Sequence, residues 1–125
     1  MKYLLDVNVL IAAIWTSHDQ HAAALKWLSS RQVVLCPITE LGFIRISTNK
    51  KVLNASMERT RELLSKFAMD AKAERIPADL EALNSHPRKS DQVTDHYLAD
   101  LAAKHGVKLG TLDEQLKHPS AELVS

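Results

Sequence analysis

The fold is decided by the stretch Tyr3-Leu4-Leu5-Asp6-Val7-Asn8-Val9-Leu10-Ile11, which begins with a short, uninterrupted apolar run that ends at one carboxylate. Such a run is typical of a strand that is buried on both faces of a parallel sheet. Ligands of open α/β sheets bind in the crevice at the carboxyl ends of the strands. Asp6 directly follows the first expected strand, so it lies at the edge where a functional site is expected.

Three more acidic residues stand at similar borders between apolar segments. Glu40 opens the helix that is expected after Pro37. Asp95 lies in the first turn of another expected helix, where an ionised carboxylate is favoured and where Thr94 is the predicted N-cap. Asp113 follows a strand-like segment at residues 107–111. We therefore expect all four carboxylates to face one edge of one sheet.

The rest of the chain alternates between helical and strand-like patterns. Helices are expected at residues 8–14, 19–30, 37–49, 56–72, 78–84, 94–105 and 114–117, and strands at 2–5, 33–36, 75–77 and 107–111. The last residues form either an edge strand or a loose tail. Strands that alternate with helices predict the α/β class: one domain over residues 1–125, built as a three-layer α/β/α sandwich around a central, mainly parallel sheet.

Composition limits the class of protein. The chain has 125 residues, 46% of them hydrophobic and 25% charged, which is ordinary for one globular domain. No apolar run approaches the roughly 20 residues of a membrane span, and the start shows no signal-peptide pattern, so we expect a cytoplasmic protein without membrane contact. The single Cys36, expected to be buried, agrees with a reducing compartment. A net charge of +1 excludes a uniformly basic surface but not a local patch that binds nucleic acid.

A cluster of carboxylates suits hard divalent cations. Mg²⁺ and Mn²⁺ prefer oxygen ligands in octahedral geometry, with waters at the remaining positions. Without a cation the like charges would repel one another and raise the pKa values of the carboxyls. With one or two ions the cluster can activate a water and stabilise charge on a phosphodiester. Because no dedicated nucleophile is apparent nearby, attack by metal-activated water is the natural mechanism.

The chain resembles the PIN-domain proteins, specifically the VapC-type toxin ribonucleases of bacterial type II toxin–antitoxin systems. The segments that carry the resemblance are residues 5–11, 36–45, 92–98 and 109–113. The resemblance implies one PIN-like α/β/α domain whose catalytic and metal-binding residues are Asp6, Glu40, Asp95 and Asp113. It also implies Mg²⁺- or Mn²⁺-dependent endonucleolytic cleavage of structured RNA, commonly tRNA or ribosomal RNA, inhibition by a cognate antitoxin, and a homodimer.

Other polar residues near these segments have two interpretations each. Asn8 either contacts the site or caps the first helix, and Thr111 either hydrogen-bonds a metal-bound water or ends a strand. Arg45 follows Glu40 along its helix and can steer phosphates toward the site. Asp91 would share the face of Asp95 only if one helix covered both residues.

The histidines give weaker signals. His18 and His21 have the spacing of a metal-ligand pair but lack a third ligand, so a plain surface position is favoured. His96 projects about 100° around the helix from Asp95, which makes it a candidate for substrate contact. Asp100, further along that helix, is expected on a solvated face.

Two alternatives to a metal-dependent nuclease follow from the residues. An Asp after an amino-terminal strand also suggests a haloacid-dehalogenase-like phosphatase, but that chemistry needs a second Asp two residues later, where this chain has Asn8. A catalytically silent PIN-like binding module is the other alternative. Occupation of all four acidic positions argues against it, and titration with Mg²⁺ or Mn²⁺ would distinguish the two.

Overall fold

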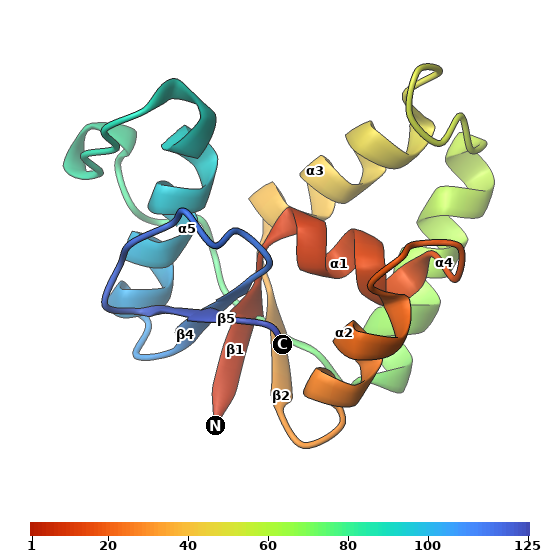
Figure 1. Cartoon of the computed structure of the whole chain (residues 1–125), viewed down its shortest axis with the longest axis horizontal. Helices are drawn as coiled ribbons and strands as arrows, with labels where there is room; N and C mark the ends of the chain where they lie inside the picture. Colours follow the sequence, from red (N-terminus) through yellow and green to blue (C-terminus); the bar gives the residue numbers. More distant parts are fainter.

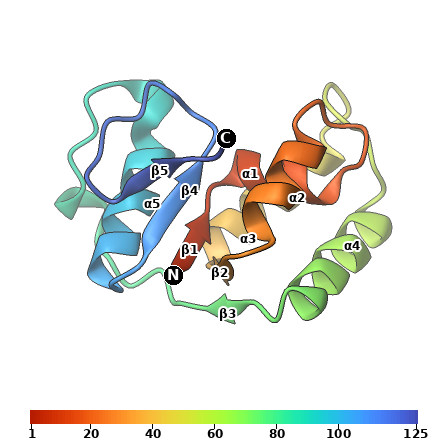
Figure 2. The ribbon, with the colours of Figure 1, turned by 60° about the horizontal axis from the view of Figure 1, so that its bottom comes forward.

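A five-stranded parallel sheet runs through the protein in the order β3-β2-β1-β4-β5 (Figures 1 and 2). The computed structural model describes all 125 residues, and the strands are β1 (Lys2–Leu5), β2 (Gln32–Leu35), β3 (Glu74–Arg75), β4 (Lys108–Thr111) and β5 (Ala121–Leu123). Leu4 of β1 lies opposite Val34 of β2 and Leu109 of β4. The remaining pairs, β2 with β3 and β4 with β5, are parallel as well. β1 is therefore the central strand.

Five α-helices cover the two faces of the sheet. They are α1 (Val7–Ile14), α2 (His21–Leu28), α3 (Pro37–Thr48), α4 (Met57–Asp70) and α5 (Val93–Lys104), and 3-10 turns at Ala82–Asn84 and Ser90–Gln92 precede α5. Helices α1 to α4 lie on one side and α5 lies on the other (Figure 2). The predicted three-layer α/β/α sandwich is confirmed. No helix combines the length and the apolar character that crossing a membrane would require.

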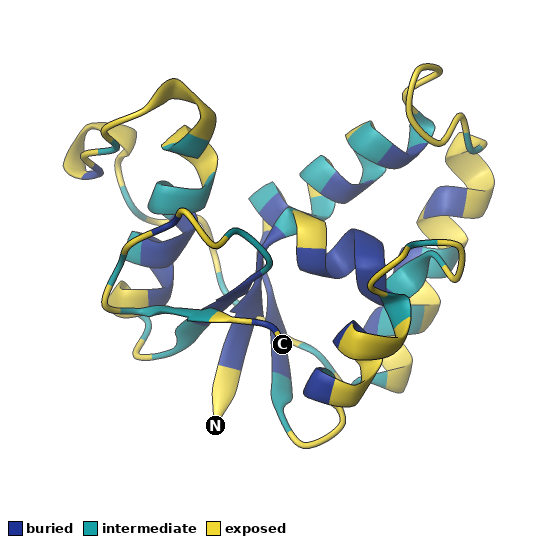
Figure 3. Cartoon of the chain, in the orientation of Figure 1, coloured by how far each residue is buried: buried dark blue, intermediate teal, exposed yellow.

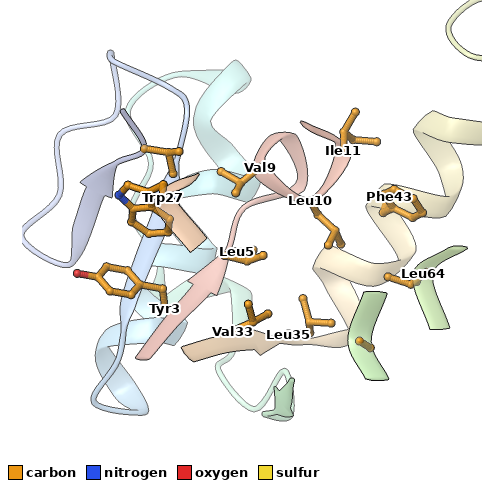
Figure 4. Packing of buried hydrophobic residues seen from close by; sticks show 12 residues of the cluster. Tyr3, Leu5, Val9, Leu10, Ile11, Trp27, Val33, Leu35, Phe43 and Leu64 are labelled. Carbon is orange, nitrogen blue, oxygen red and sulfur yellow. The ribbon is translucent and has the colours of Figure 1, made fainter. Parts of the chain in front are cut away.

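Alternate residues of β1 enter two separate cores. Tyr3 and Leu5 join the larger cluster beneath α1 to α4, where the ring of Tyr3 meets Trp27 edge-on with centroids 4.7 Å apart (Figure 4). Leu4 points the other way, into a cluster with Leu98 of α5. From Tyr3 to Leu5 β1 is buried (Figure 3), and since these side chains enter both cores, this part of the strand is continuously apolar rather than alternating.

The path of the chain changes direction at β1. From β1 it moves outward to β2 and β3, and after α5 it returns to β4 and β5 on the opposite side. Neighbouring strands whose connections leave in opposite directions open a crevice at their carboxyl ends, and α1, α3 and α5 all begin near this edge (Figure 1). Asp6, the first residue after β1, therefore lies at the crevice.

The start of α5 differs from the expected one. Gln92 occupies the N-cap position instead of Thr94, and Val93 is the first helical residue. The cause is the preceding 3-10 turn, in which the N–H of Gln92 donates to the carbonyl of Lys89 at 3.1 Å, so the chain is already coiling before Thr94. Asp95 still lies in the first turn of the helix.

Two predicted short helices are wrong. Residues 78–84 contain only the 3-10 turn at Ala82–Asn84, and residues 114–117 form turns without a helix. Four residues before Pro119 provide too few intrahelical bonds to offset helix nucleation. The chain instead crosses to the sheet edge, where it forms β5, so the edge-strand interpretation of the tail is confirmed. Strand β3 ends at Arg75, two residues before Pro77, which has no N–H to donate.

Candidate active site

Asp6 is a buried carboxylate at the crevice, with only 1% of its surface exposed. Its backbone N–H donates to the carbonyl of Gly110 on β4 at 3.0 Å, which ties the end of β1 to the neighbouring strand. Its Oδ2 accepts a hydrogen bond from the Thr111 hydroxyl at 2.8 Å. Its Oδ1 is buried and has no hydrogen-bond partner. A buried acceptor without a donor is costly, so this oxygen is a candidate ligand for a cation.

Asp95 faces Asp6 from the first turn of α5. Burial, followed by the negative charge of Asp6, raises the pKa of Asp95 to about 7. Burial also raises the pKa of Asp6, although the hydrogen bond from Thr111 opposes the shift. The charges of Asp6 and Asp113 both act on Asp95, and the charge of Asp113 also acts on Asp6. The three aspartates thus form one electrostatic unit.

Thr111 links Asp6 to Asp113. The hydroxyl of Thr111 donates to Asp6 and accepts from the backbone N–H of Asp113 at 3.0 Å. The carboxylate of Asp113 accepts from the N–H of Gln115 at 2.8 Å, which holds the turn after β4. Thr111 therefore both ends its strand and fixes the relative positions of two carboxylates.

Glu40 has a different environment from the three aspartates. It lies in the first turn of α3, and its two carboxylate oxygens accept hydrogen bonds from Nε and Nη2 of Arg75, each at 3.2 Å. Arg75 belongs to the edge strand β3 and is about half exposed. The sequence did not indicate this pair, because its members are 35 residues apart. No three of the four predicted carboxylates bring their oxygens within 4.8 Å of one another.

The other candidate residues are Asn8, Arg45 and Asp91, and none of them forms a side-chain hydrogen bond. Asn8 is exposed in the second position of α1, whose N-cap is Asp6, so the interpretation of Asn8 as the cap is wrong. Arg45 is exposed near the end of α3 and forms no ion pair. Asp91 lies in the 3-10 turn before α5, not in the helix with Asp95, yet its negative charge contributes to the raised pKa of Asp95.

A second cluster on α5 was not anticipated. Asp100 accepts hydrogen bonds from Nδ1 of His96 at 3.1 Å and from Nε2 of His118 at 2.7 Å, so its predicted solvated position is wrong. Burial alone would raise the pKa of Asp100, but hydrogen bonds from His118 and Ser85 and the charges of the histidines outweigh burial and lower it. The four-residue spacing of His96 and Asp100 was visible in the sequence, whereas the approach of His118 was not.

His18 and His21 do not pair around a common ligand. Nδ1 of His21 lies 2.8 Å from the carbonyl of Ala12, and Nδ1 of His18 accepts from the N–H of Gln20 at 3.0 Å. Each ring therefore serves the local turn between α1 and α2. The only cluster whose ligand atoms all lie within 4.8 Å of one another is that of His96, Asp100 and His118.

The aspartate centre fits a hard divalent cation by its chemistry, although its carboxylate oxygens are more widely spaced than those of a closed metal site. It offers a buried oxygen without a donor on Asp6 and carboxyls whose pKa values are raised by burial and mutual repulsion. A bound cation would supply the missing partner and relieve the repulsion. The residues at the sheet edge therefore suit Mg²⁺ or Mn²⁺ better than they suit the metal-free state.

Comparison with known proteins gives consistent matches over nearly the whole chain. Residues 3–122 match the PIN domain family. Ribonuclease VapC39 of Mycobacterium tuberculosis is 38% identical, covering 93% of this chain and 91% of that protein. Ribonuclease VapC38 of the same species is 35% identical, covering 88% and 84%. Ribonuclease VapC29, also from that species, is 34% identical, covering 94% and 90%.

A solved structure shares the fold. The crystal structure of VapBC2 from Rickettsia felis, bound to a DNA fragment from their promoter, contains a chain that superposes with a TM-score of 0.65. The superposition covers 98% of this chain and 97% of the other at 18% sequence identity. At this level of identity the match supports the architecture alone.

Proposed function

Because the chain belongs to the PIN-domain family and to its VapC ribonucleases, we propose that it is a divalent-metal-dependent endoribonuclease that acts as the toxin of a bacterial toxin–antitoxin pair. The observation that carries the metal dependence is the buried, unpartnered Oδ1 of Asp6 beside Asp95, whose pKa is raised to about 7. Buried carboxyls that repel one another are more stable with a bound cation than without one.

The residues that would hold the ion are Asp6, Asp95 and Asp113, joined by Glu40 when its carboxylate is released from Arg75. When bound, a divalent cation at such a centre supplies activation of a water and stabilisation of the charge on the phosphodiester. Thr111 keeps Asp6 and Asp113 in register through its two hydrogen bonds. By analogy with the VapC-type ribonucleases that the sequence resembles, we assign structured RNA, either tRNA or ribosomal RNA, as the substrate.

The two alternative activities find less support. The phosphatase mechanism needs an acid two residues after the first Asp, and Asn8 there is an exposed amide on α1. A silent binding module has no need to bury an unpaired carboxylate oxygen at the crevice, because that arrangement costs stability and contributes nothing to a scaffold.

We further propose a cognate antitoxin as partner and a homodimer as the working assembly. Glu40 is already bound in a two-bond fork by Arg75, which demonstrates that this carboxylate accepts a guanidinium in that geometry. An arginine from the antitoxin would then compete with the cation for Glu40. The neighbouring gene tests the idea: a short open reading frame whose product inhibits cleavage should lie beside this one.

A metal-depletion experiment tests the enzymatic proposal. Protein stripped of metal should leave a mixture of tRNA and ribosomal RNA intact, cleave it once Mg²⁺ or Mn²⁺ is added, and stop in excess EDTA. Calorimetric titration with Mn²⁺ should show binding that Asp6→Asn abolishes and that Asp70→Asn, at an exposed position on α4, leaves unchanged. Full cleavage in excess EDTA would overturn the metal dependence, and absence of Mn²⁺ binding would favour the silent module.

A further inference from the structure

A hollow lined entirely by polar residues lies between the loop before α5 and the segment after β4. Its volume is about 570 Å³, and none of its seven lining residues is hydrophobic. His86, Arg88 and Lys89 line it from the loop before α5, and Lys117 lines it from the segment after β4. No carboxylate contributes to the lining. The hollow is therefore a concentration of positive charge in a chain whose net charge is only +1.

The cations of this hollow are not neutralised by the protein. Arg88 and Lys89 are exposed and form neither an ion pair nor a side-chain hydrogen bond, and Lys117 donates only to the carbonyl of Glu114, at 3.2 Å. Single unpaired cations such as Arg45 occur elsewhere on the surface, but here three of them line one cavity. Three like charges around one cavity repel one another unless an anion binds between them.

The walls of the hollow are the segments that also carry the catalytic aspartates. Gln92 stands three residues before Asp95, and Gln115 stands two residues after Asp113. The side-chain amide of Gln92 donates to the carbonyl of Gln115 at 3.2 Å, so the two walls are joined directly. Gln115 and Lys117 also line a second hollow, to which Asp113 and Thr111 belong, so an anion in the basic hollow shares a wall with the aspartate centre.

We propose that this basic hollow binds a backbone phosphate of the RNA adjacent to the phosphodiester that is cut. The inference rests on the proposed ribonuclease function and names how its substrate is held. A carboxylate centre on its own repels a polyanion, whereas neighbouring cations attract each phosphate that they neutralise. An RNA strand carries phosphates at every nucleotide, so one strand can present one phosphate to the aspartates and the next to the hollow. An acidic peptide offers no group that the aspartate centre would hold, so the adjacency of the two sites favours RNA.

The experiment measures RNA binding apart from cleavage. Fluorescence anisotropy with labelled bulk tRNA in Mg²⁺ measures binding in the cleavage-deficient Asp6→Asn background. The double substitution Arg88→Gln with Lys89→Gln should raise Kd about tenfold. It should also lower the slope of log Kd against log salt concentration by about two, because two phosphate-neutralising charges are lost. The matched control, Lys26→Gln with Arg61→Gln, removes the same two charge types at exposed positions that do not line the hollow, and it should change Kd by less than about twofold. Lys117→Gln, on the opposite wall, should weaken binding as a single variant.

Equal Kd and equal salt slope in the hollow and control variants would overturn the proposal. So would unchanged tRNA binding together with weaker binding of a labelled polyglutamate peptide, since the hollow would then serve an acidic protein segment. In the active background, the hollow variants should raise KM and leave kcat nearly unchanged. If the parent does not cleave RNA but the hollow variants still lose tRNA affinity, the ribonuclease proposal fails and the phosphate site stands. If the parent cleaves and KM does not change, the phosphate site fails alone.

Discussion

Two aspartates on one helix have opposite electrostatic environments. Asp95, in the first turn of α5, faces Asp6 and Asp113, and burial and repulsion raise its pKa to about 7. Asp100, one turn and a half further along, accepts hydrogen bonds from two histidines and has a lowered pKa. The Asp100 cluster is compensated by the chain itself. The Asp95 cluster is not, and that difference marks it as the one that needs a ligand from outside.

The largest effect should come from removing a carboxylate of the uncompensated cluster. Asp95→Asn should lower kcat/KM for RNA cleavage by about 10³-fold, because a preorganised charge at the reacting centre is lost. Asp100→Asn, on the same helix, should keep kcat/KM within about tenfold of the parent, since its carboxylate bonds only to the chain. Steady-state cleavage in Mg²⁺ compares the two variants. Equal losses of kcat/KM in the two variants would show that the electrostatic difference between the clusters has no effect on catalysis.

A smaller effect should follow from loosening the uncompensated cluster without removing a charge. Thr111→Val keeps the shape of the side chain but deletes the hydroxyl that donates to Asp6 and accepts from Asp113. Loss of a hydrogen bond that orients a metal ligand commonly costs 10- to 100-fold, so Mn²⁺ affinity and activity should both fall by about that factor. Thr94→Val, at an exposed position on α5, serves as the control. An unchanged Mn²⁺ affinity would show that Asp6 is positioned by its burial alone.

Substitution of Asp100 in the compensated cluster should lower the stability of the fold rather than the activity. Asp100→Asn weakens the contact to His96 on the same helix and the contact to His118, which attaches the segment between β4 and β5 to α5. Hydrogen bonds to a charged group contribute about 1.5–3 kcal/mol, so urea unfolding should show a loss of that size. Under metal-free conditions Asp95→Asn should be neutral or stabilising. If Asp95→Asn lost as much stability as Asp100→Asn, the two clusters would not differ in how far the protein compensates their charges.

Much of this architecture was predictable because it depends on local patterns. Short apolar runs identified β1, β2 and β4, and their ends placed Asp6 and Asp113 at the carboxyl edge of the sheet. The rule that parallel strands share one functional edge then brought the start of α5 to the same place. These local patterns were therefore sufficient to predict the α/β/α sandwich.

The missing parts depend on contacts between segments that are distant in the sequence. Arg75 reaches Glu40 across 35 residues, and His118 reaches Asp100 across 18. Both contacts depend on the paths of loops, which hydrophobic periodicity does not encode. The loop before α5 was recognisable from its polar residues, but the hollow that it forms with Lys117 requires the turn after β4, which was expected to be a helix.

The smallest predicted effect is a difference in pH dependence between the two clusters, measured without metal. The pKa of Asp95 in the folded protein, about 7, lies above its ordinary value of 3.8, so between these values the folded state binds more protons than the unfolded state. Stability then falls as pH rises from about 4 to about 7 and levels off above that. Asp100 has the opposite sign: its lowered pKa contributes stability above its ordinary value, and this is lost as pH falls through the folded value.

Urea unfolding of the metal-free parent and of Asp95→Asn across pH 4 to 8 isolates the Asp95 contribution, because the titration of the histidines is common to both proteins. The parent should lose about 1 kcal/mol more than the variant over this range, a value reduced from the full shift because Asp95 is partly exposed to solvent. Mg²⁺ should abolish the difference, since a cation compensates the ionised carboxylates. Parallel curves for the two proteins would mean that Asp95 titrates normally, and the contrast between Asp95 and Asp100 would then lose its physical basis.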